Sequence, residues 1–239
     1  MTDVIVAIKR IVKRLITRRS DPQFKRTDQQ DYLNAYAEFV NKRVARDPHE
    51  AIGGYWEELG ALQLQFLKAK GLQASHTVLD IGCGTLRGGR LLIDFLEPKK
   101  YTGYDISQAA VSFARELIAS EGLENKDPRV FWSMKGLADT ELRRMKFDVL
   151  WAQSVFTHLE PDYIEQHMAQ CGALMHEESK FFFTYEEADQ FRVEREVDFA
   201  YPYSFFEELA KQYGFQLRDL SAQYPHPRGQ RILELRRSK

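Results

Sequence analysis

Cysteine is scarce in this sequence, and so are uninterrupted apolar runs. Only Cys83 and Cys171 occur in 239 residues, and neither belongs to a C-x-x-C pair or to a cluster with histidine. This scarcity excludes a disulfide framework and gives no reason to expect a metal site, so it favours a reduced, cytoplasmic protein. No run of about 18 apolar residues occurs, which excludes an ordinary transmembrane helix. Four basic residues between positions 9 and 14 interrupt the N-terminal apolar stretch, so a signal peptide is not expected.

A large excess of charge of one sign is also missing, because the formal net charge is -1. The balance is uneven, since residues 1–20 carry six basic side chains and one acidic one. Apolar residues recur there at helical spacing opposite the basic ones, which predicts a basic amphipathic helix over residues 1–20. Its residues 4–19 suit an anionic membrane surface at the cytoplasmic face, but they also suit packing on the protein's own body or on another subunit. Nucleic-acid binding is not expected, because basic residues elsewhere are diffuse.

The rest of the chain divides into two parts. Residues 21–50 are expected to form a linker and a helical extension with a helix over 31–44, and residues 51–239 the main domain. Helices are expected over 55–70, 88–95, 108–120, 137–144, 161–175 and 204–213, and strands over 77–81, 100–104, 129–132, 147–152, 180–184, 215–220 and 230–235. This alternation predicts an α/β fold with a mostly parallel sheet and helices on both faces. The last two strands are joined by a short loop and should be antiparallel.

A glycine-rich turn, VLDIGCG over Val78–Gly84, lies between an expected strand and an expected helix. Glycines there let the backbone adopt positive φ and approach a ligand closely. The next strand ends near Asp105, where a carboxylate can accept hydrogen bonds from ribose hydroxyls. A dinucleotide site would need glycine in place of Arg87, and Asp80 would repel a pyrophosphate. Asp80 suits a cationic amino-acid ligand instead.

Three segments carry a resemblance to a known family. Val78–Gly84 resembles the first motif of class I S-adenosylmethionine-dependent methyltransferases, Asp105 resembles their ribose-binding acid, and Phe147–Leu159 resembles their fourth motif. Ile52–Gly60, followed by Thr85–Gly89, is similar to a bacterial subgroup whose substrates are mostly unassigned. The resemblance implies a Rossmann-like, seven-stranded, mostly parallel sheet with an antiparallel last strand, and S-adenosylmethionine as the cofactor.

The resemblance also implies a set of cofactor-binding residues: Asp80, Gly82, Gly84, Asp105, Ile106, Ser133, Met134 and Gln153. Among them, Asp80 would hold the amino group of the methionine moiety and Asp105 the ribose. Ser133 and Met134 would complete the adenine rim, although the acidic residue often found there is missing. Residues 153–156 lack the Asn-Pro-Pro-Tyr type of signature used on nucleobase amines, so a base-modifying enzyme of that type is not expected.

The residues that handle the acceptor are less distinct. Alcohols and phenols must lose a proton during methylation, and His158 and His226 are the candidate bases, each with a structural alternative. Residues expected near the acceptor are Trp56, Arg87, Tyr201, Tyr203 and Arg228. Arg87 would bind an acidic acceptor or cap its loop, and Trp56 would form a lid or pack in the core.

The sequence therefore predicts a methyltransferase that acts on a small molecule or a glycan or lipid precursor, with oxygen as the favoured target. A non-catalytic S-adenosylmethionine-binding regulator or scaffold is the alternative from another class. A nicotinamide-dependent oxidoreductase is disfavoured by Asp80 and Arg87.

Overall fold

The computed structural model describes residues 29–195 and 197–238 of the chain. Its α-helices are α2 (Gln29–Arg46), α3 (Pro48–Ala51), α4 (Trp56–Ala69), α5 (Gly89–Phe95), α6 (Gln108–Ser120), α7 (Pro161–Cys171) and α8 (Tyr203–Gln212). Its strands are β1 (Val78–Ile81), β2 (Tyr101–Asp105), β3 (Arg129–Trp132), β4 (Phe147–Ala152), β5 (Met175–Glu187), β6 (Arg192–Arg195), β7 (Asp198–Tyr201), β8 (Phe215–Asp219) and β9 (Arg231–Arg237). The predicted basic helix of residues 1–20 lies outside the described residues.

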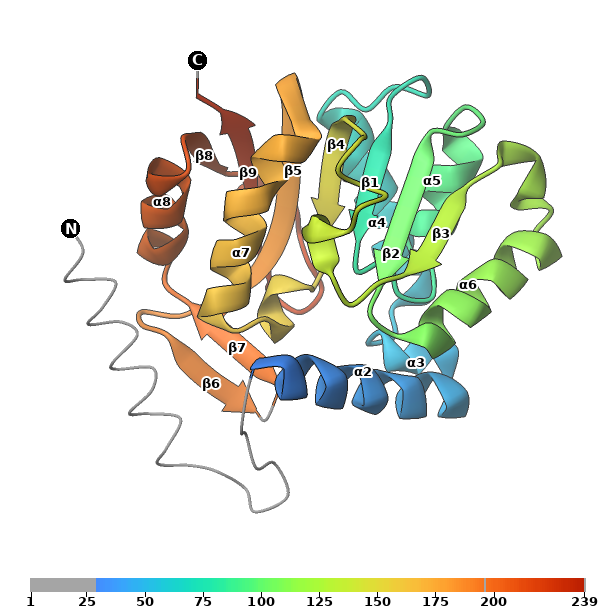
Figure 1. Ribbon diagram of the computed structural model, residues 1–239, viewed down its shortest axis with the longest axis horizontal. Coiled ribbons are helices and arrows are strands. Elements are labelled where there is room, and N and C mark those ends of the chain that lie inside the picture. Colours follow the sequence, from blue (N-terminus) through green and yellow to red (C-terminus); the bar gives the residue numbers. More distant parts are fainter. Residues whose placement is uncertain (1–28, 196, 239) are drawn as a thin grey trace.

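The centre of the sheet has the strand order β3-β2-β1-β4-β5, and these strands are parallel (Figure 1). β9 continues the sheet beside β5 and runs antiparallel to both β5 and β8. The order β3-β2-β1-β4-β5-β9-β8 confirms the predicted Rossmann-like, seven-stranded sheet with an antiparallel last strand. The loop between β8 and β9 is too short for a crossover helix, which explains why this pair is antiparallel.

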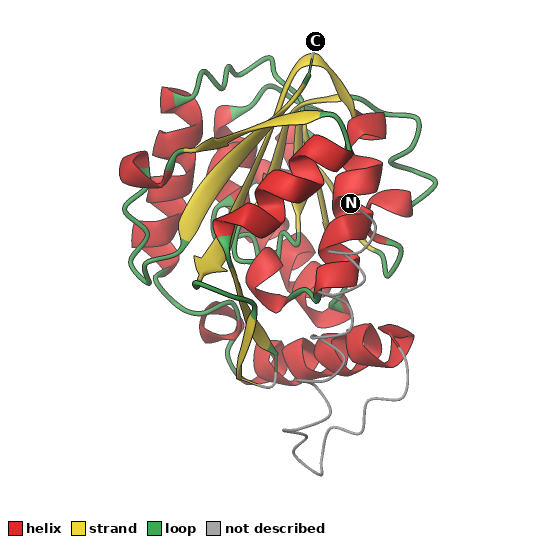
Figure 2. Cartoon of the chain, turned by 90° about the vertical axis from the view of Figure 1, so that its left-hand side faces the viewer, coloured by secondary structure: helices red, strands yellow, loops and turns green. Residues whose placement is uncertain are grey.

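Helices cover both faces of the sheet (Figure 2). Alternate strand residues point to opposite faces, and the two faces have separate hydrophobic clusters. Leu79 and Ile81 of β1 belong to the cluster that includes residues of α7 and α8. Val78 belongs to the other cluster, with residues of α4, α5 and α6. None of the helices within the described residues combines the length and hydropathy needed to cross a membrane.

Two additions lie at the carboxyl ends of the parallel strands. α2 lies across this edge of the sheet, and the hairpin of β6 and β7 lies beside it (Figure 1). β7 pairs in parallel with the end of β5, where Glu186 faces Ala200, and β6 pairs antiparallel with β7. Ligands of open α/β sheets bind outside this edge, so both additions stand next to the expected site.

The secondary structure departs from the sequence-based prediction in several places. No α-helix forms over residues 137–144, where Asp139 Oδ1 instead accepts a hydrogen bond from the backbone N–H of Glu141. Such local bonds compete with the helical pattern. The helix predicted over 161–175 ends at Cys171. β6 and β7 have no counterpart in the prediction, because Arg192–Arg195 is exposed throughout and shows no alternation of apolar and polar residues.

Candidate active site

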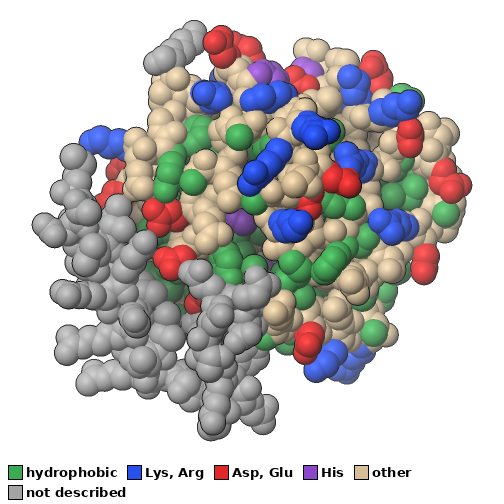
Figure 3. All heavy atoms as spheres, viewed as in Figure 1, with side chains coloured by type: hydrophobic (Ala, Val, Ile, Leu, Met, Phe, Trp, Pro, Cys, Tyr) green, Lys and Arg blue, Asp and Glu red, His purple; other side chains and the backbone are tan. Residues whose placement is uncertain are grey.

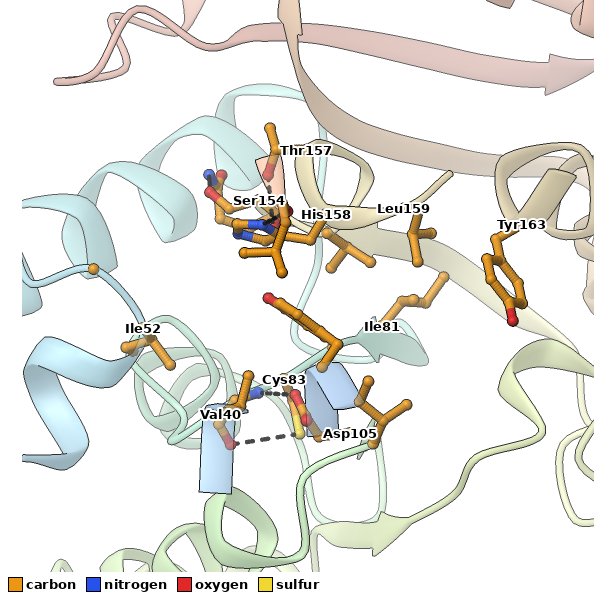
Figure 4. A pocket seen from close by; sticks show the side chains of 18 of the residues that line it. Val40, Ile52, Ile81, Cys83, Asp105, Ser154, Thr157, His158, Leu159 and Tyr163 are labelled. Carbon is orange, nitrogen blue, oxygen red and sulfur yellow. Dashed lines mark hydrogen bonds between the residues drawn. The ribbon is translucent and has the colours of Figure 1, made fainter. Parts of the chain in front are cut away.

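A cavity of about 1470 Å³ lies at the carboxyl edge of the sheet. Its walls come from the turns after β1, β2 and β4, from α2 and from the β6–β7 hairpin. Figure 4 shows Cys83 and Asp105 on one side of the cavity and Ser154, Thr157 and His158 on the opposite side. In the space-filling view a histidine lies in a recess near the centre, with hydrophobic side chains below it and acidic side chains to its left (Figure 3).

The predicted site residues mostly meet in this cavity. Those that line it are Asp80, Gly82, Gly84, Arg87, Asp105, Ile106, Met134, Gln153, His158, His226 and Arg228. Those that do not are Trp56, Ser133, Tyr201 and Tyr203.

The turn after β1 depends on its two glycines. Gly82 and Gly84 have φ angles of +65° and +54°, in the left-handed region that is costly for other residues. A Cβ atom on Gly82 would lie 2.6 Å from Cγ2 of Val155, and one on Gly84 would lie 2.9 Å from Cγ2 of Ile52. The turn therefore presents bare backbone to the cavity.

Asp105 ends β2 beside this turn. Its Oδ2 accepts a hydrogen bond from the N–H of Gly84 at 2.9 Å, and its Oδ1 accepts one from the N–H of Ser107 at 2.8 Å. Burial raises the pKa of Asp105, and the backbone hydrogen bonds oppose this rise. Because each carboxylate oxygen has two acceptor sites, both oxygens keep a lone pair for hydroxyl donors in the cavity.

Asp80 lies in β1, two residues before Gly82. Its side chain is buried, and its Oδ2 accepts a hydrogen bond from Tyr101 Oη at 2.7 Å. Burial raises the pKa of Asp80 to about 7; the bond from Tyr101 opposes this rise, and the charge of Asp105 adds to it. A carboxylate whose negative charge is disfavoured in this way gains most from a cationic ligand group.

The expected adenine rim is only partly in place. Ile106 and Met134 line the cavity, but Ser133 does not. The Ser133 hydroxyl is used within its own loop, because it donates to Asp139 Oδ2 at 2.7 Å and accepts from the N–H of Lys135 at 3.1 Å. The placement of Ser133 at the ligand is therefore corrected.

A polar cluster follows the end of β4. Gln153 Oε1 accepts a hydrogen bond from Tyr224 Oη at 2.6 Å, and Gln153 Nε2 lies 3.0 Å from His226 Nε2. Ser154 has a φ of +56°, and its Oγ donates to Gln230 Oε1 at 2.9 Å. Strained backbone held by surrounding bonds is typical of functional sites. Tyr224 and Gln230 have no signal in the sequence, because they reach Gln153 only through the pairing of distant strands.

His226 is held neutral in this cluster. Its Nδ1 accepts a hydrogen bond from the backbone N–H of Arg228 at 3.2 Å. Burial and, to a smaller extent, the positive charges of Arg87 and Arg228 lower the pKa of His226 to about 4. The protonated imidazole is disfavoured here, so His226 is a poor acceptor of protons at neutral pH.

Arg87 and Arg228 both hold the loop that precedes α4. Arg87 Nη1 donates to the carbonyl oxygens of Ile52 and Gly54 at 2.9 and 2.8 Å. Arg228 Nη2 donates to the carbonyl oxygen of Gly53. Both side chains line the cavity, but the hydrogen bonds favour the loop-capping interpretation of Arg87 over binding of an acidic acceptor.

Three aromatic residues expected near the acceptor lie elsewhere. The Trp56 ring stacks on His49, with 3.9 Å between the ring centroids. Tyr201 is fully buried and donates its hydroxyl hydrogen to the carbonyl oxygen of Leu159. Tyr203 begins α8 and packs against the hydrophobic core. Tyr201 and Tyr203 are therefore core residues rather than acceptor contacts, and Trp56 belongs to a surface stack outside the cavity.

His158 lies on the opposite side of the cavity from Asp105, in the 3-10 helix Phe156–His158. Its Nδ1 lies 2.9 Å from the carbonyl oxygen of Val197 and 3.0 Å from Asp198 Oδ1. The ring of Tyr36 stacks on the imidazole with a centroid distance of 5.3 Å. The hydrogen bond from His158 lowers the pKa of Asp198. Sequence analysis does not single out Asp198 or Tyr36, because neither belongs to a local motif.

Comparisons with known proteins agree with this geometry. Residues 79–181 match a family model described as a methyltransferase domain. The ubiquinone biosynthesis O-methyltransferase of Nitrosococcus oceani is 30% identical to this chain over 128 residues. The alignment covers 53% of this chain and 50% of that protein, so the chain spans about half the length of the curated relative it matches.

Two solved structures are similar over nearly their whole length. The magnesium protoporphyrin IX methyltransferase of Synechocystis PCC 6803, solved with bound S-adenosylmethionine, has a TM-score of 0.65 and 16% identity, and the match covers 90% of this chain and 100% of that one. The CcbJ methyltransferase of Streptomyces caelestis has a TM-score of 0.64 and 18% identity, over 85% of this chain and 98% of that one. At these identities the likeness concerns the fold.

The fold is thus that of the class I S-adenosylmethionine-dependent methyltransferases. Residues 79–181 match the model of a methyltransferase domain, in agreement with the family indicated by the motif at Val78–Gly84.

Proposed function

We propose that this chain binds S-adenosylmethionine in the cavity and transfers its methyl group to an oxygen atom of a small-molecule acceptor. The observation that carries this proposal is the pair Asp80 and Asp105, a buried and a half-buried carboxylate near the carboxyl ends of neighbouring strands, which both line one cavity. S-adenosylmethionine supplies a methyl group on a sulfonium sulfur, with a thioether as the leaving group.

The residues present fit this cofactor. Asp105 has lone pairs left for two ribose hydroxyls, and Asp80 has the negative charge that an ammonium group needs. Ile106 and Met134 offer apolar contact for a base. The glycine turn after β1 leaves backbone exposed to the methionine part, since a Cβ on Gly82 would meet Val155. The cavity of about 1470 Å³ exceeds the roughly 300–1,000 Å³ of ordinary small-ligand sites, which leaves room for an acceptor as well.

Oxygen is the proposed target because a base stands at the far side of the cavity. His158 is paired with a carboxylate, whereas His226 has a pKa lowered to about 4 by burial and two arginines. His158 is therefore the proposed proton acceptor for a hydroxyl group. The similar protein of Nitrosococcus oceani, an O-methyltransferase, supports the same choice.

Isothermal titration with S-adenosylmethionine and S-adenosylhomocysteine tests the cofactor site. Wild type should bind both, and Asp105→Asn should weaken both by about tenfold or more, because bonds to a charged acceptor are lost. Asp94→Asn, an exposed residue of α5 outside the cavity, is the matched control and should bind as wild type does. Absence of binding by wild type would refute the proposal, and equal binding by Asp105→Asn would refute this placement of the cofactor. Methyl transfer to a panel of phenols and aliphatic alcohols then tests the oxygen target.

The domain division predicted from the sequence also leads to a proposal. α2, from the predicted extension, lines the cavity, and Asn41 Oδ1 accepts hydrogen bonds from Ser107 Oγ at 2.7 Å and Ala109 N at 3.1 Å. We therefore place α2 with the methyltransferase domain. Deletion of residues 1–20 should preserve S-adenosylhomocysteine binding, and deletion of residues 1–46 should weaken it.

Residues 1–20 are proposed to bring the protein to the cytoplasmic face of a membrane, where a glycan or lipid precursor would be the acceptor. The support is the basic, amphipathic pattern of residues 4–19. Flotation with anionic liposomes should recover the full chain but not the chain that lacks residues 1–20. Equal recovery of both would refute the membrane role.

A further inference from the structure

His158 is held from two directions by elements outside the seven-stranded sheet. From α2, Tyr36 stacks on the imidazole and Tyr32 Oη donates to the His158 carbonyl oxygen at 2.7 Å. From the β6–β7 hairpin, Val197 and Asp198 face the ring nitrogen Nδ1. The position of the imidazole is therefore set by segments that lie far from it in the sequence.

The hydrogen-bond partners decide which nitrogen carries the proton. The Val197 carbonyl oxygen and Asp198 Oδ1 are both acceptors, at 2.9 and 3.0 Å from Nδ1, so Nδ1 must donate. The neutral imidazole then has its lone pair on Nε2. No hydrogen bond joins Nε2 to any residue that the structure describes, and His158 lines the cavity, so Nε2 is the nitrogen left for a ligand.

We propose that Asp198 is the positioning residue for His158: together with the Val197 carbonyl oxygen it fixes the tautomer with Nε2 free, and its charge stabilises the imidazolium that forms when Nε2 accepts a proton from an acceptor hydroxyl. This inference rests on the proposed function. It assigns a role in catalysis to the β6–β7 hairpin and limits the acceptor class to hydroxyl compounds that need deprotonation, since a carboxylate acceptor needs no base.

The proton balance of the step is simple. The O–H bond of the acceptor breaks and its proton moves to Nε2, while the oxygen forms a bond to the methyl carbon. The electron pair of the broken carbon–sulfur bond stays on sulfur, and the proton later leaves the imidazolium for solvent. Asp198 stays ionised throughout, because its charge is what stabilises the imidazolium.

Other charges near this pair have to be considered. Arg43 of α2 and Arg195 of β6 both lower the pKa of Asp198, after the larger effect of His158 itself. Arg195 Nε lies 3.8 Å from Asp198 Oδ2, the oxygen that does not face His158. Burial raises the pKa of Tyr36, so its hydroxyl is neutral at ordinary pH. Burial raises the pKa of Glu186 of β5, and the charges of Glu194 and Asp198 raise it further, so acidic groups also face Asp198.

The test measures the imidazole pKa of His158 by NMR on the full-length chain with labelled histidine and no cofactor. His158→Gln identifies the resonance among the six histidines. Asp198→Asn should lower this pKa by about one pH unit, as expected when an opposite charge in contact is removed, and Asp198→Glu should restore most of it. Asp189→Asn, an exposed residue near the hairpin, is the charge control, and His176, which pairs with Asp148 at 3.0 Å, is the internal reference.

The outcomes separate this inference from the proposed function. An unchanged His158 pKa in Asp198→Asn overturns the positioning role, even if the variant binds S-adenosylhomocysteine normally. Failure of wild type to bind S-adenosylhomocysteine overturns the proposed function but leaves the pKa comparison intact. With a phenol as acceptor, Asp198→Asn should lower kcat about tenfold or more with little change in KM, and should move the rising limb of the pH profile with the NMR pKa. A profile that does not move overturns the role of His158 as base.

Discussion

Replacement of Asp80 by asparagine should stabilise the protein and weaken its cofactor binding at the same time. Asp80 is buried, and burial raises its pKa from an ordinary 3.8 to about 7. The folded state therefore binds a proton more tightly than the unfolded chain does. The stability that this proton provides is complete below pH 3.8 and is lost as the pH rises through about 7.

The magnitude of this change in stability follows from the raised pKa of Asp80. At about 1.4 kcal/mol per pH unit, the ionised carboxylate costs the folded state about 4 kcal/mol above pH 7, of which about 3 kcal/mol develops between pH 5 and pH 8. Asparagine has no charge to bury and keeps an oxygen for the hydrogen bond from Tyr101. The free energy of unfolding of Asp80→Asn should therefore exceed that of wild type by an amount that grows as the pH rises.

Urea denaturation of both proteins without cofactor, at pH values from about 5 to 8, measures this difference. Titration with S-adenosylmethionine over the same range supplies the second readout. Wild-type affinity should fall as Asp80 becomes protonated below about pH 7, and the affinity of Asp80→Asn should be lower and nearly independent of pH. If the stability difference between the two proteins were constant across this range, the assignment of a raised pKa to Asp80 would be refuted.

Two further predictions concern the turn and α2. Gly82→Ala should lose at least about 2 kcal/mol of unfolding free energy, from its φ of +65° and a Cβ 2.6 Å from Val155. Gly122→Ala, with a φ of +69° and no atom within 4 Å, should lose only the backbone part, about 1 kcal/mol, so equal losses in urea melts would contradict the steric argument. Asn41→Ala should lose about 1 kcal/mol and weaken S-adenosylhomocysteine binding, since Asn41 joins α2 to the start of α6. Glu38→Ala, exposed on the same helix, is its control in the same melts and titrations, and similar behaviour of the two variants would count against a role for α2 in the site.

The sequence by itself determined the central part of the fold and one half of the candidate site. Alternation of apolar runs and helical stretches carries its information locally, so the parallel sheet could be predicted before any contact was known. The antiparallel pairing of β8 and β9 followed from a short loop that excludes a crossover. The residues around Val78–Gly84 and Asp105 were predictable for a similar reason, because the ends of neighbouring parallel strands necessarily meet at one edge of the sheet.

Only the tertiary structure decided which residues form the acceptor side of the candidate site. Trp56, Tyr201 and Tyr203 looked like acceptor contacts by position, but packing places them in a surface stack and in the core. The tertiary structure gives the two histidines opposite electrostatic surroundings. His226 is buried near two arginines, whereas His158 lies beside the carboxylate of Asp198. No periodic pattern specifies such pairs. They depend on how α2 and the β6–β7 hairpin dock onto the sheet, and that docking results from many long-range contacts rather than from a local run of residues.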